Sequence, residues 1–400
     1  MVSYTAMLCR GLAALGVRPW VLTGRVAPDC EDLRAVAIHP WRQRLSPWTK
    51  LWSRIEGLLQ PGQPGWQQRV WTRALVEGVE RVRAAAPDGG LSVLELEEAW
   101  GLAARMARAS PVPVVVRLHG PWFLNGSANG EPADRAYRRR VRLEGRGLAA
   151  AAGVTAPSRD VLERTRRAYG LPLEHASVLP NPIELPGESE TWRPAGCDPQ
   201  RVLFVGRFDR HKGGDVALDA FAQLARELPK LRLVMVGPDR GVRDDAGRRW
   251  SLEAYLGERL GDVRGRVEVL GELEPERLGL LRRQAMVTIV PSRYEVFGYT
   301  AVEAMAAGCP VVVSEAGGLA EMVQDGRNGL FAQPGDAADL ARQVRRVVED
   351  PELARRLGGQ ARADVGERYT PEVVARRTLA FYGEVVARCG RTRTGGDDGS

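Results

Sequence analysis

Two glutamates, eight residues apart, lie in the stretch of sequence best suited to chemistry. Glu295 follows the apolar run 286–290, which predicts a buried strand, and Glu303 lies in a predicted helix over 298–307. The apolar run 309–313 predicts a further strand, which completes a βαβ unit. Ligands of such units bind at the carboxyl ends of the strands. We therefore expect Glu295 at a ligand crevice, and Glu303 about two helical turns further on, facing it.

This arrangement suits a sugar that is joined to a diphosphate. Each carboxylate can accept hydroxyl protons in charge-assisted hydrogen bonds. The backbone N–H groups of Val296, Phe297 and Gly298, at the start of the predicted helix, suit a phosphate. The alternative is a helix with an acidic first turn and one ordinary glutamate, and composition alone does not separate the two interpretations.

A second strand and loop carry the cations that such a ligand needs. The run 201–205 predicts a strand that continues into a glycine-rich loop, in which Gly206 precedes Arg207 and Lys212. Two cations at the carboxyl end of a strand form a natural phosphate site. The alternative is a loop with solvated basic side chains. Lysine is rare in this chain, which favours a specific role for Lys212; the three lysines are Lys50, Lys212 and Lys230.

His119 is a third candidate for chemistry. The buried run 112–118 predicts a parallel strand, and His119 lies at its carboxyl end, on the crevice side. A lone histidine is most often structural. This position favours a catalytic or donor-orienting role instead.

The net charge of +7 is unevenly distributed along the 400 residues. There are 26 basic and 19 acidic residues up to Gly196, and 31 of each after it. This distribution argues against a nucleic-acid-binding protein and for a local anionic partner of the first half. The segment 41–73 combines tryptophan with basic residues, which is typical of an interfacial helix on an anionic membrane. The alternative is a lid helix packed on its own domain.

A predicted helix over 133–152 also carries a basic group. We interpret its arginines as a solvated face, with contact to an acceptor phosphate as the alternative; they are Arg138, Arg139, Arg140 and Arg142. The five cysteines are scattered and form no CxxC pair, which fits a reducing compartment. No apolar run approaches the ~18 residues of a membrane span. These features predict a cytoplasmic protein, with a peripheral position on the inner face of the plasma membrane as a further possibility.

Strands and helices alternate along the whole chain, which predicts an α/β protein of two Rossmann-like domains. The expected parts are an N-terminal domain (1–185), a C-terminal domain (200–370), a helix crossing back (371–388) and a disordered tail (389–400), with 185–199 as a linker. A Rossmann domain normally begins with a strand and a glycine-rich turn, and this sequence begins with a predicted helix. We expect either that this domain lacks its first strand or that the true start lies upstream, and we favour the second.

These motifs resemble the retaining glycosyltransferases of family 4 (glycosyl transferases group 1), which have the GT-B fold. The resemblance covers nearly the whole chain and is strongest from 201 to 332. It is carried by Gly206-Arg207-Phe208 with Lys212-Gly213, by Glu295 and Glu303 with Phe297-Gly298, and by Gly317-Gly318-Leu319-Ala320-Glu321. Asn328-Gly329-Leu330 and Leu179-Pro180-Asn181 add to it.

The resemblance implies a role for each candidate residue. Arg207 and Lys212 would hold the donor diphosphate and stabilise the charge on the leaving group. Glu303 would accept the ribose hydroxyls, and Glu295 would bind the transferred sugar beside the backbone of 296–298. His119 would reach the sugar from the first domain. Such a site needs neither a metal nor a cofactor, and the nucleotide sugar is a substrate.

The expected function is therefore transfer of a sugar from a UDP- or GDP-sugar to a glycan or lipid-linked glycan, in cell-surface or extracellular polysaccharide biosynthesis. The loop 120–126 resembles members that build extracellular polysaccharide. A non-catalytic nucleotide-sugar-binding or assembly subunit, with an incomplete first domain, is the alternative. A NAD-dependent enzyme is disfavoured because no G-x-G-x-x-G follows a first strand.

Overall fold

The computed structural model describes residues 4–23, 34–37, 65–86, 90–98, 101–128 and 132–394. These residues form two compact units. One unit comprises 181–373, and the other combines residues up to 180 with those from 374 onward. Of the segment 41–73, which was predicted to contact a membrane, residues 41–64 lie outside the described residues.

The unit of residues 181–373 contains a six-stranded, entirely parallel sheet. Its strands are β7 (Asp198–Val205), β9 (Arg232–Val236), β12 (Val267–Val269), β13 (Ala285–Val290), β14 (Val311–Ser314) and β15 (Leu330–Ala332). Every residue of β13 and β14 is buried, as expected for parallel strands covered on both faces. The helices are α8 (Gly214–Glu227), α9 (Leu252–Tyr255), α10 (Pro275–Gln284), α11 (Tyr299–Ala306), α12 (Gly318–Met322), α13 (Ala337–Glu349) and α14 (Pro351–Arg368).

The strand order of this sheet is β12-β9-β7-β13-β14-β15. The chain therefore builds outward from β7 in one direction and outward from β13 in the other. Between these two central strands the order reverses, and such a switch point opens a crevice at the carboxyl ends of the strands. A small sheet of β8 (Phe208–Asp209), β10 (Asp239–Arg243) and β11 (Arg249–Trp250) lies beside it in the same unit.

The segment predicted as a linker, 185–199, is part of the unit of residues 181–373 and packs within it. Trp192 is 5% exposed, its backbone N–H donates to Ala307 O (2.7 Å), and its indole donates to Ala285 O (2.7 Å). Burial of a tryptophan with both donors satisfied stabilises the segment in place. The linker prediction missed this anchor because proline, glycine and charge dominate the surrounding composition.

The other unit contains a four-stranded parallel sheet in the order β3-β4-β5-β6, and a separate parallel pair of β1 and β2. Its strands are β1 (Trp20–Thr23), β2 (Arg34–Ala37), β3 (Leu94–Glu97), β4 (Val114–Arg117), β5 (Gly153–Ala156) and β6 (Ala176–Val178). Its helices are α1 (Tyr4–Ala14), α3 (Gly65–Ala85), α4 (Leu102–Ala109), α5 (Trp122–Ala128), α6 (Arg135–Ala150) and α7 (Arg159–Tyr169).

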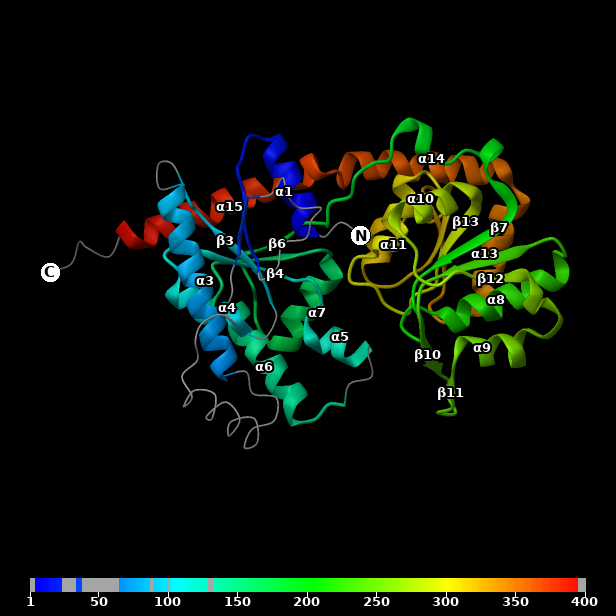
Figure 1. Cartoon of the computed structure of the whole chain (residues 1–400), viewed down its shortest axis with the longest axis horizontal. Coiled ribbons are helices and arrows are strands. Elements are labelled where there is room, and N and C mark those ends of the chain that lie inside the picture. The colour runs from blue at the N-terminus through cyan, green and yellow to red at the C-terminus, as the bar shows by residue number, and fades with distance from the viewer. Residues whose placement is uncertain are drawn as a thin grey trace. The chain divides into compact units, whose positions relative to one another are not determined.

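The last helix, α15 (Pro371–Thr394), packs mainly on this unit (Figure 1). Phe381 and Val385 join a core cluster with Val115 and Leu179. The helix continues to Thr394, so the residues 389–394 that were predicted as a disordered tail are helical. The prediction ended the helix too early because the polar residues at its end carry no apolar stripe.

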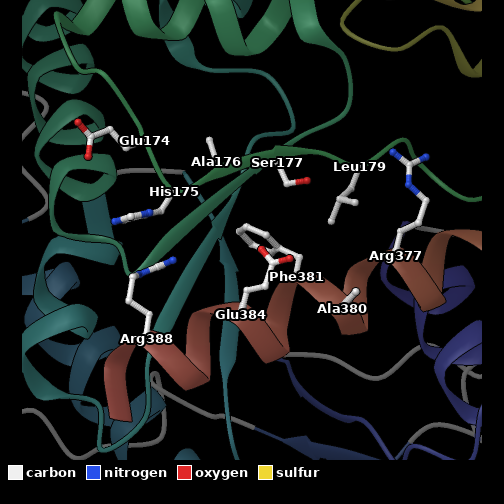
Figure 2. Close-up of a pocket in the computed structure, with 10 residues that line it drawn as sticks. All are labelled: Glu174, His175, Ala176, Ser177, Leu179, Arg377, Ala380, Phe381, Glu384 and Arg388. Carbon is white, nitrogen blue, oxygen red and sulfur yellow. The ribbon is translucent and has the colours of Figure 1, made fainter. Parts of the chain in front are cut away.

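Beside β6, α15 borders a cavity of about 370 Å³, shown in Figure 2. Two arginines at its rim attach the helix to the sheet. Arg377 donates to Val178 O (3.0 Å), and Arg388 donates to Ala152 O. These bonds satisfy the carbonyl group of Val178, in the edge strand β6, and that of Ala152, just before β5.

Candidate donor-binding site

The loops after β7 and β13 meet at the switch point of the six-stranded sheet. Lys212 Nζ donates to Glu295 Oε1 at 2.6 Å, although the two residues are 83 positions apart. The parallel pairing of β7 with β13 brings both loops to the same edge. The predicted phosphate cation and the predicted sugar-binding carboxylate are therefore direct neighbours.

The carboxylate of Glu295 is fixed from one side. Ser292, whose side chain is buried, donates from its hydroxyl to the same Oε1 at 2.7 Å. Oε2 receives no hydrogen bond from the part of the chain that the structure describes. Glu295 is only 8% exposed, so few side-chain orientations are open to it. Ser292 and Lys212 together hold Oε1 and leave Oε2 for a ligand.

The Gly317-Gly318 pair lets another loop approach Glu295 closely. The Gly318 N–H donates to Glu295 O at 2.7 Å. Gly317 has φ +55°, and a Cβ on it would lie 2.2 Å from Glu295 O. A side chain at position 317 would therefore push the loop away from the site. This contact gives a physical reason for the glycines of the sequence motif.

Asp209 organises both cations of the first loop. Arg207 Nε donates to one carboxylate oxygen of Asp209 (2.6 Å), and the backbone N–H of Lys212 donates to the other (2.7 Å). Sequence reasoning missed Asp209, although an acid between two cations in so short a loop was a usable signal. In the same loop, desolvation lowers the pKa of His211 despite the nearby Glu295 carboxylate.

Glu303 lies on α11 and forms an ion pair with Arg282 of α10. The Arg282 side chain is 8% exposed and that of Glu303 is 18% exposed, so the pair is shielded from water. Arg282 was not predicted, because no local pattern links two residues that are 21 positions apart on different helices. The ribose-binding role of Glu303 stays a prediction.

The backbone at the start of α11 resembles that of an anion-binding site. Its N-cap, Gly298, has φ +98° and supplies no side-chain cap. The N–H groups of Phe297 and Gly298 meet no acceptor among the described residues. Both groups lie at the N-terminal end of a helix, where the helix dipole favours negative charge.

His119 belongs to the other unit, at the end of β4. Its backbone N–H donates to both oxygens of Glu98 (3.1 and 3.2 Å), and the Gly120 N–H donates to Oε1 of the same carboxylate (2.8 Å). Its imidazole packs edge-to-face on Tyr4, with ring centroids 5.0 Å apart. The sequence did not identify Glu98 as the residue that holds His119.

The surroundings shift the pKa values of His119 and Glu98 in opposite directions. Desolvation, and then the Arg117 guanidinium, lower the pKa of His119 to about 4, although the residue as a whole is exposed to solvent. Burial raises the pKa of Glu98 to about 7 against the two backbone N–H donors. His119 is therefore neutral near pH 7, where an imidazole can both donate and accept a hydrogen bond.

The cavity in Figure 2 contains none of these residues. The site lies instead at the carboxyl ends of β7 and β13, and it is defined by the polar groups that converge there. Within the described ranges, no group of three or more His, Cys, Asp or Glu side chains could hold a metal ion. No helix in those ranges is long and apolar enough to cross a membrane.

Comparison with known proteins identifies the family. The family model "Glycosyltransferase Family 4" matches residues 1–185, and "Glycosyl transferases group 1" matches residues 194–364. The D-inositol 3-phosphate glycosyltransferase of Acidothermus cellulolyticus is 31% identical over 373 residues, which cover 88% of this chain and 79% of that protein. The 2-deoxystreptamine glucosyltransferase of Streptomyces kanamyceticus is 30% identical over 409 residues, which cover 95% and 98% of the two chains.

Among solved structures, sucrose-phosphate synthase from Thermosynechococcus elongatus aligns with a TM-score of 0.67 and 25% identity, over 96% of this chain and 93% of that one. The two α/β units, with a polar cluster at the switch point of a parallel sheet, define a GT-B glycosyltransferase. The chain belongs to glycosyltransferase family 4, of the glycosyl transferases group 1 type. The predicted family, fold class and enzyme class are confirmed, and the alternative of a non-catalytic subunit is not favoured.

Proposed function

We propose that this glycosyltransferase moves a sugar from a UDP- or GDP-sugar to a glycan or lipid-linked glycan, with retention of configuration at the transferred carbon. The observation that carries the proposal is the contact between Lys212 and Glu295 at the switch point. It combines a cation suited to a diphosphate with a carboxylate suited to sugar hydroxyls, within 2.6 Å of each other.

The cations of the first loop would stabilise the leaving nucleoside diphosphate. The Lys212 ammonium has three N–H donors and gives one to Glu295, so two are left for phosphate oxygens. Arg207 gives its Nε to Asp209, and its 40% exposed side chain keeps the Nη donors accessible. Both cations are oriented before the donor arrives, which is the condition for effective electrostatic stabilisation.

The carboxylates would recognise the hydroxyl groups of the donor. Oε2 of Glu295 would accept from the transferred sugar, and Glu303 would accept from the ribose. The N–H groups at the start of α11 would add donors for the diphosphate. His119, neutral at pH 7, would exchange hydrogen bonds with the sugar from the other unit.

This donor site would need no metal and no cofactor, because two cations and a helix start supply the positive charge that a divalent ion supplies elsewhere. Removal of divalent ions with a chelator is therefore expected to leave the rate unchanged. A chelator-sensitive rate that is restored by Mg²⁺ or Mn²⁺ would contradict the metal-independent mechanism.

The acceptor class is the part of the proposal that needs the widest test. We expect a growing cell-surface or extracellular glycan, and a cytoplasmic enzyme that works on or near the inner face of the plasma membrane. The names of the two relatives indicate cyclitol acceptors, so a phosphorylated or amino cyclitol is a second candidate class.

The test is a mass-spectrometric assay of nucleoside diphosphate release from UDP-, GDP- and ADP-sugars, with and without each acceptor class. The Glu295→Gln variant runs beside the unchanged enzyme. Release from one donor, lost in the variant, supports the proposal and names the donor. NMR of the product reports whether the anomeric configuration is retained. Release that the variant performs equally well would remove Glu295 from the mechanism.

A further inference from the structure

Five arginines form one continuous stripe along α6. At 100° per residue their positions fall within an arc of about 100° around the helix axis; they are Arg135, Arg138, Arg139, Arg142 and Arg146. Four of them are exposed, and Arg139 is half-buried. The buried face of the helix, around Glu144, Gly147 and Leu148, is on the opposite side.

No acidic side chain of the described residues neutralises this stripe. Glu144, the one acid of α6, is buried and accepts from the Trp122 N–H (2.8 Å), the Tyr169 hydroxyl (3.0 Å) and Arg140 (3.3 Å). Asp134 precedes the helix and is used as its N-cap. Desolvation, and then the charges of Arg135 and Arg142, lower the pKa of Arg139. The arginines therefore repel one another.

Helix α7, in the same unit, shows that a high arginine content does not by itself produce such a stripe. Arg164 pairs there with Asp160 at 2.8 Å, and Arg166 pairs with Glu163 at 2.7 Å. Spacings of three and four residues bring these opposite charges together on the helix surface. On α6 the same spacings bring arginine next to arginine, which is destabilising.

The neighbouring helix α4 is also basic. α4 packs against α6, and its charged residues are Arg105 and Arg108, with no acid among its eight residues. Neither arginine has an ion-pair partner among the described residues. Together the two helices carry eight arginines and one acid, which is buried.

We propose that the α6 stripe is a docking surface for an anionic lipid bilayer. A bilayer presents a plane of mobile phosphates, which can supply the missing counter-charge to a straight row about 16 Å long. None of the exposed large hydrophobic side chains of the described residues lies on α6, so docking is electrostatic and remains at headgroup level. Base stacking needs exposed aromatic rings, and the nearby Trp122 ring is covered by Arg140, which argues against single-stranded nucleic acid.

The test is co-flotation of the full chain with vesicles of phosphatidylcholine, alone or with roughly a third phosphatidylglycerol. One variant combines Arg135→Gln, Arg138→Gln, Arg142→Gln and Arg146→Gln. The matched control removes the same charge from α7 by Arg159→Gln, Arg164→Gln, Arg166→Gln and Arg167→Gln. A third variant replaces the four α6 arginines by lysine, which keeps the charge. Thermal melting verifies that each variant is folded.

We expect binding to the anionic vesicles only, and its loss at about 0.5 M salt, where screening is strong. The binding of the α6 glutamine variant to anionic vesicles should fall by more than about tenfold. The binding of the α7 control and of the lysine variant should each fall by less than about threefold. Equal binding by the α6 glutamine and α7 variants would overturn the proposal. Binding of the unchanged protein to neutral vesicles would also overturn it. The same holds if the protein binds a soluble nucleic acid or anionic polysaccharide but does not bind vesicles. Donor turnover is measured separately, so failure here does not affect the proposed reaction.

Discussion

The donor loops and the His119 loop hold their polar groups by different means. In the unit of residues 181–373, opposite charges pair directly, as in Lys212 with Glu295 and Arg282 with Glu303. In the other unit, Glu98 holds the His119 loop through neutral backbone N–H groups. A paired carboxylate has a cation that favours its charge, whereas Glu98 has only dipoles to offset its burial.

This difference teaches where the enzyme is sensitive to pH. The donor loops are held together by a direct ion pair, Lys212 with Glu295. Glu98 has its pKa raised to about 7, so its charge changes within that range. Donor binding and sugar positioning should therefore respond differently to pH, and variants in each region can separate the two.

The largest effect is expected from the charge pair of the donor loops. Glu295→Gln and Lys212→Ala should each lower kcat/KM by about 100- to 1000-fold, because each removes a preorganised charge from the reacting region. Steady-state kinetics with the preferred donor measures this loss. Lys230→Ala is the matched control, since Lys230 is exposed and follows the far end of α8, the helix that begins after the Lys212 loop. A normal rate in either site variant would refute the assigned roles.

The second effect concerns how the free energy of unfolding depends on pH. The pKa of Glu98 rises from its ordinary value near 4.5 to about 7, so the folded protein binds this proton more tightly than the unfolded chain. Stability is therefore lost as the pH rises from about 4.5 to 7, by about 3 kcal/mol at most. Glu98→Gln should remove this loss, so its melting temperature should fall less than that of the unchanged enzyme between these pH values.

His119 gives the opposite sign and so provides the control. Its pKa is lowered to about 4, so the unfolded chain binds the proton more tightly and stability rises with pH from about 4 to 6.5. This gain is smaller than the Glu98 loss because solvent screens the partly accessible imidazole. His119→Gln should therefore steepen the decline that Glu98→Gln removes. Identical melting profiles for the two variants would contradict the titration of this pair.

The third effect tests the shielded pair of α10 and α11. Arg282→Met leaves the Glu303 carboxylate without its counter-ion and should cost roughly 2 kcal/mol of unfolding free energy. It should also raise KM for the donor if Glu303 binds ribose. Denaturant unfolding measures the first quantity and kinetics the second. Arg283→Met is the control, because the adjacent Arg283 lies 3.8 Å from Glu190 in a more exposed pair. Equal destabilisation by both would contradict the role of the Arg282 pair.

The smallest effect is expected from Ser292→Ala. It removes one of the two donors to Glu295 Oε1 and leaves Lys212 in place. A lost hydrogen bond of about 1 kcal/mol corresponds to a fall of roughly fivefold in kcat/KM. Ser292→Thr retains the hydroxyl and should recover part of the rate. A full rate in the alanine variant would show that Lys212 alone orients the carboxylate.

Local patterns allowed much of the fold to be predicted. The buried runs that became β13 and β14, and the helix between them, have the period and length that define strands and helices on their own. The motif residues Arg207, Lys212 and Glu295 were predicted from residue type and loop position. Asp209, Ser292, Arg282 and Glu98 were not predicted as site residues, because each acts through a partner that only the folded chain brings close.

The sequence by itself determined the family, the alternation of strands and helices, and the loops that carry the charged residues, because these depend on short-range spacing. Tertiary structure alone decided that β7 and β13 are neighbours at a switch point, so that Lys212 and Glu295 meet across 83 residues. It also decided that α15 continues to Thr394 and that Trp192 anchors the segment 185–199. Strand order and burial depend on contacts between distant segments, and no local pattern encodes them.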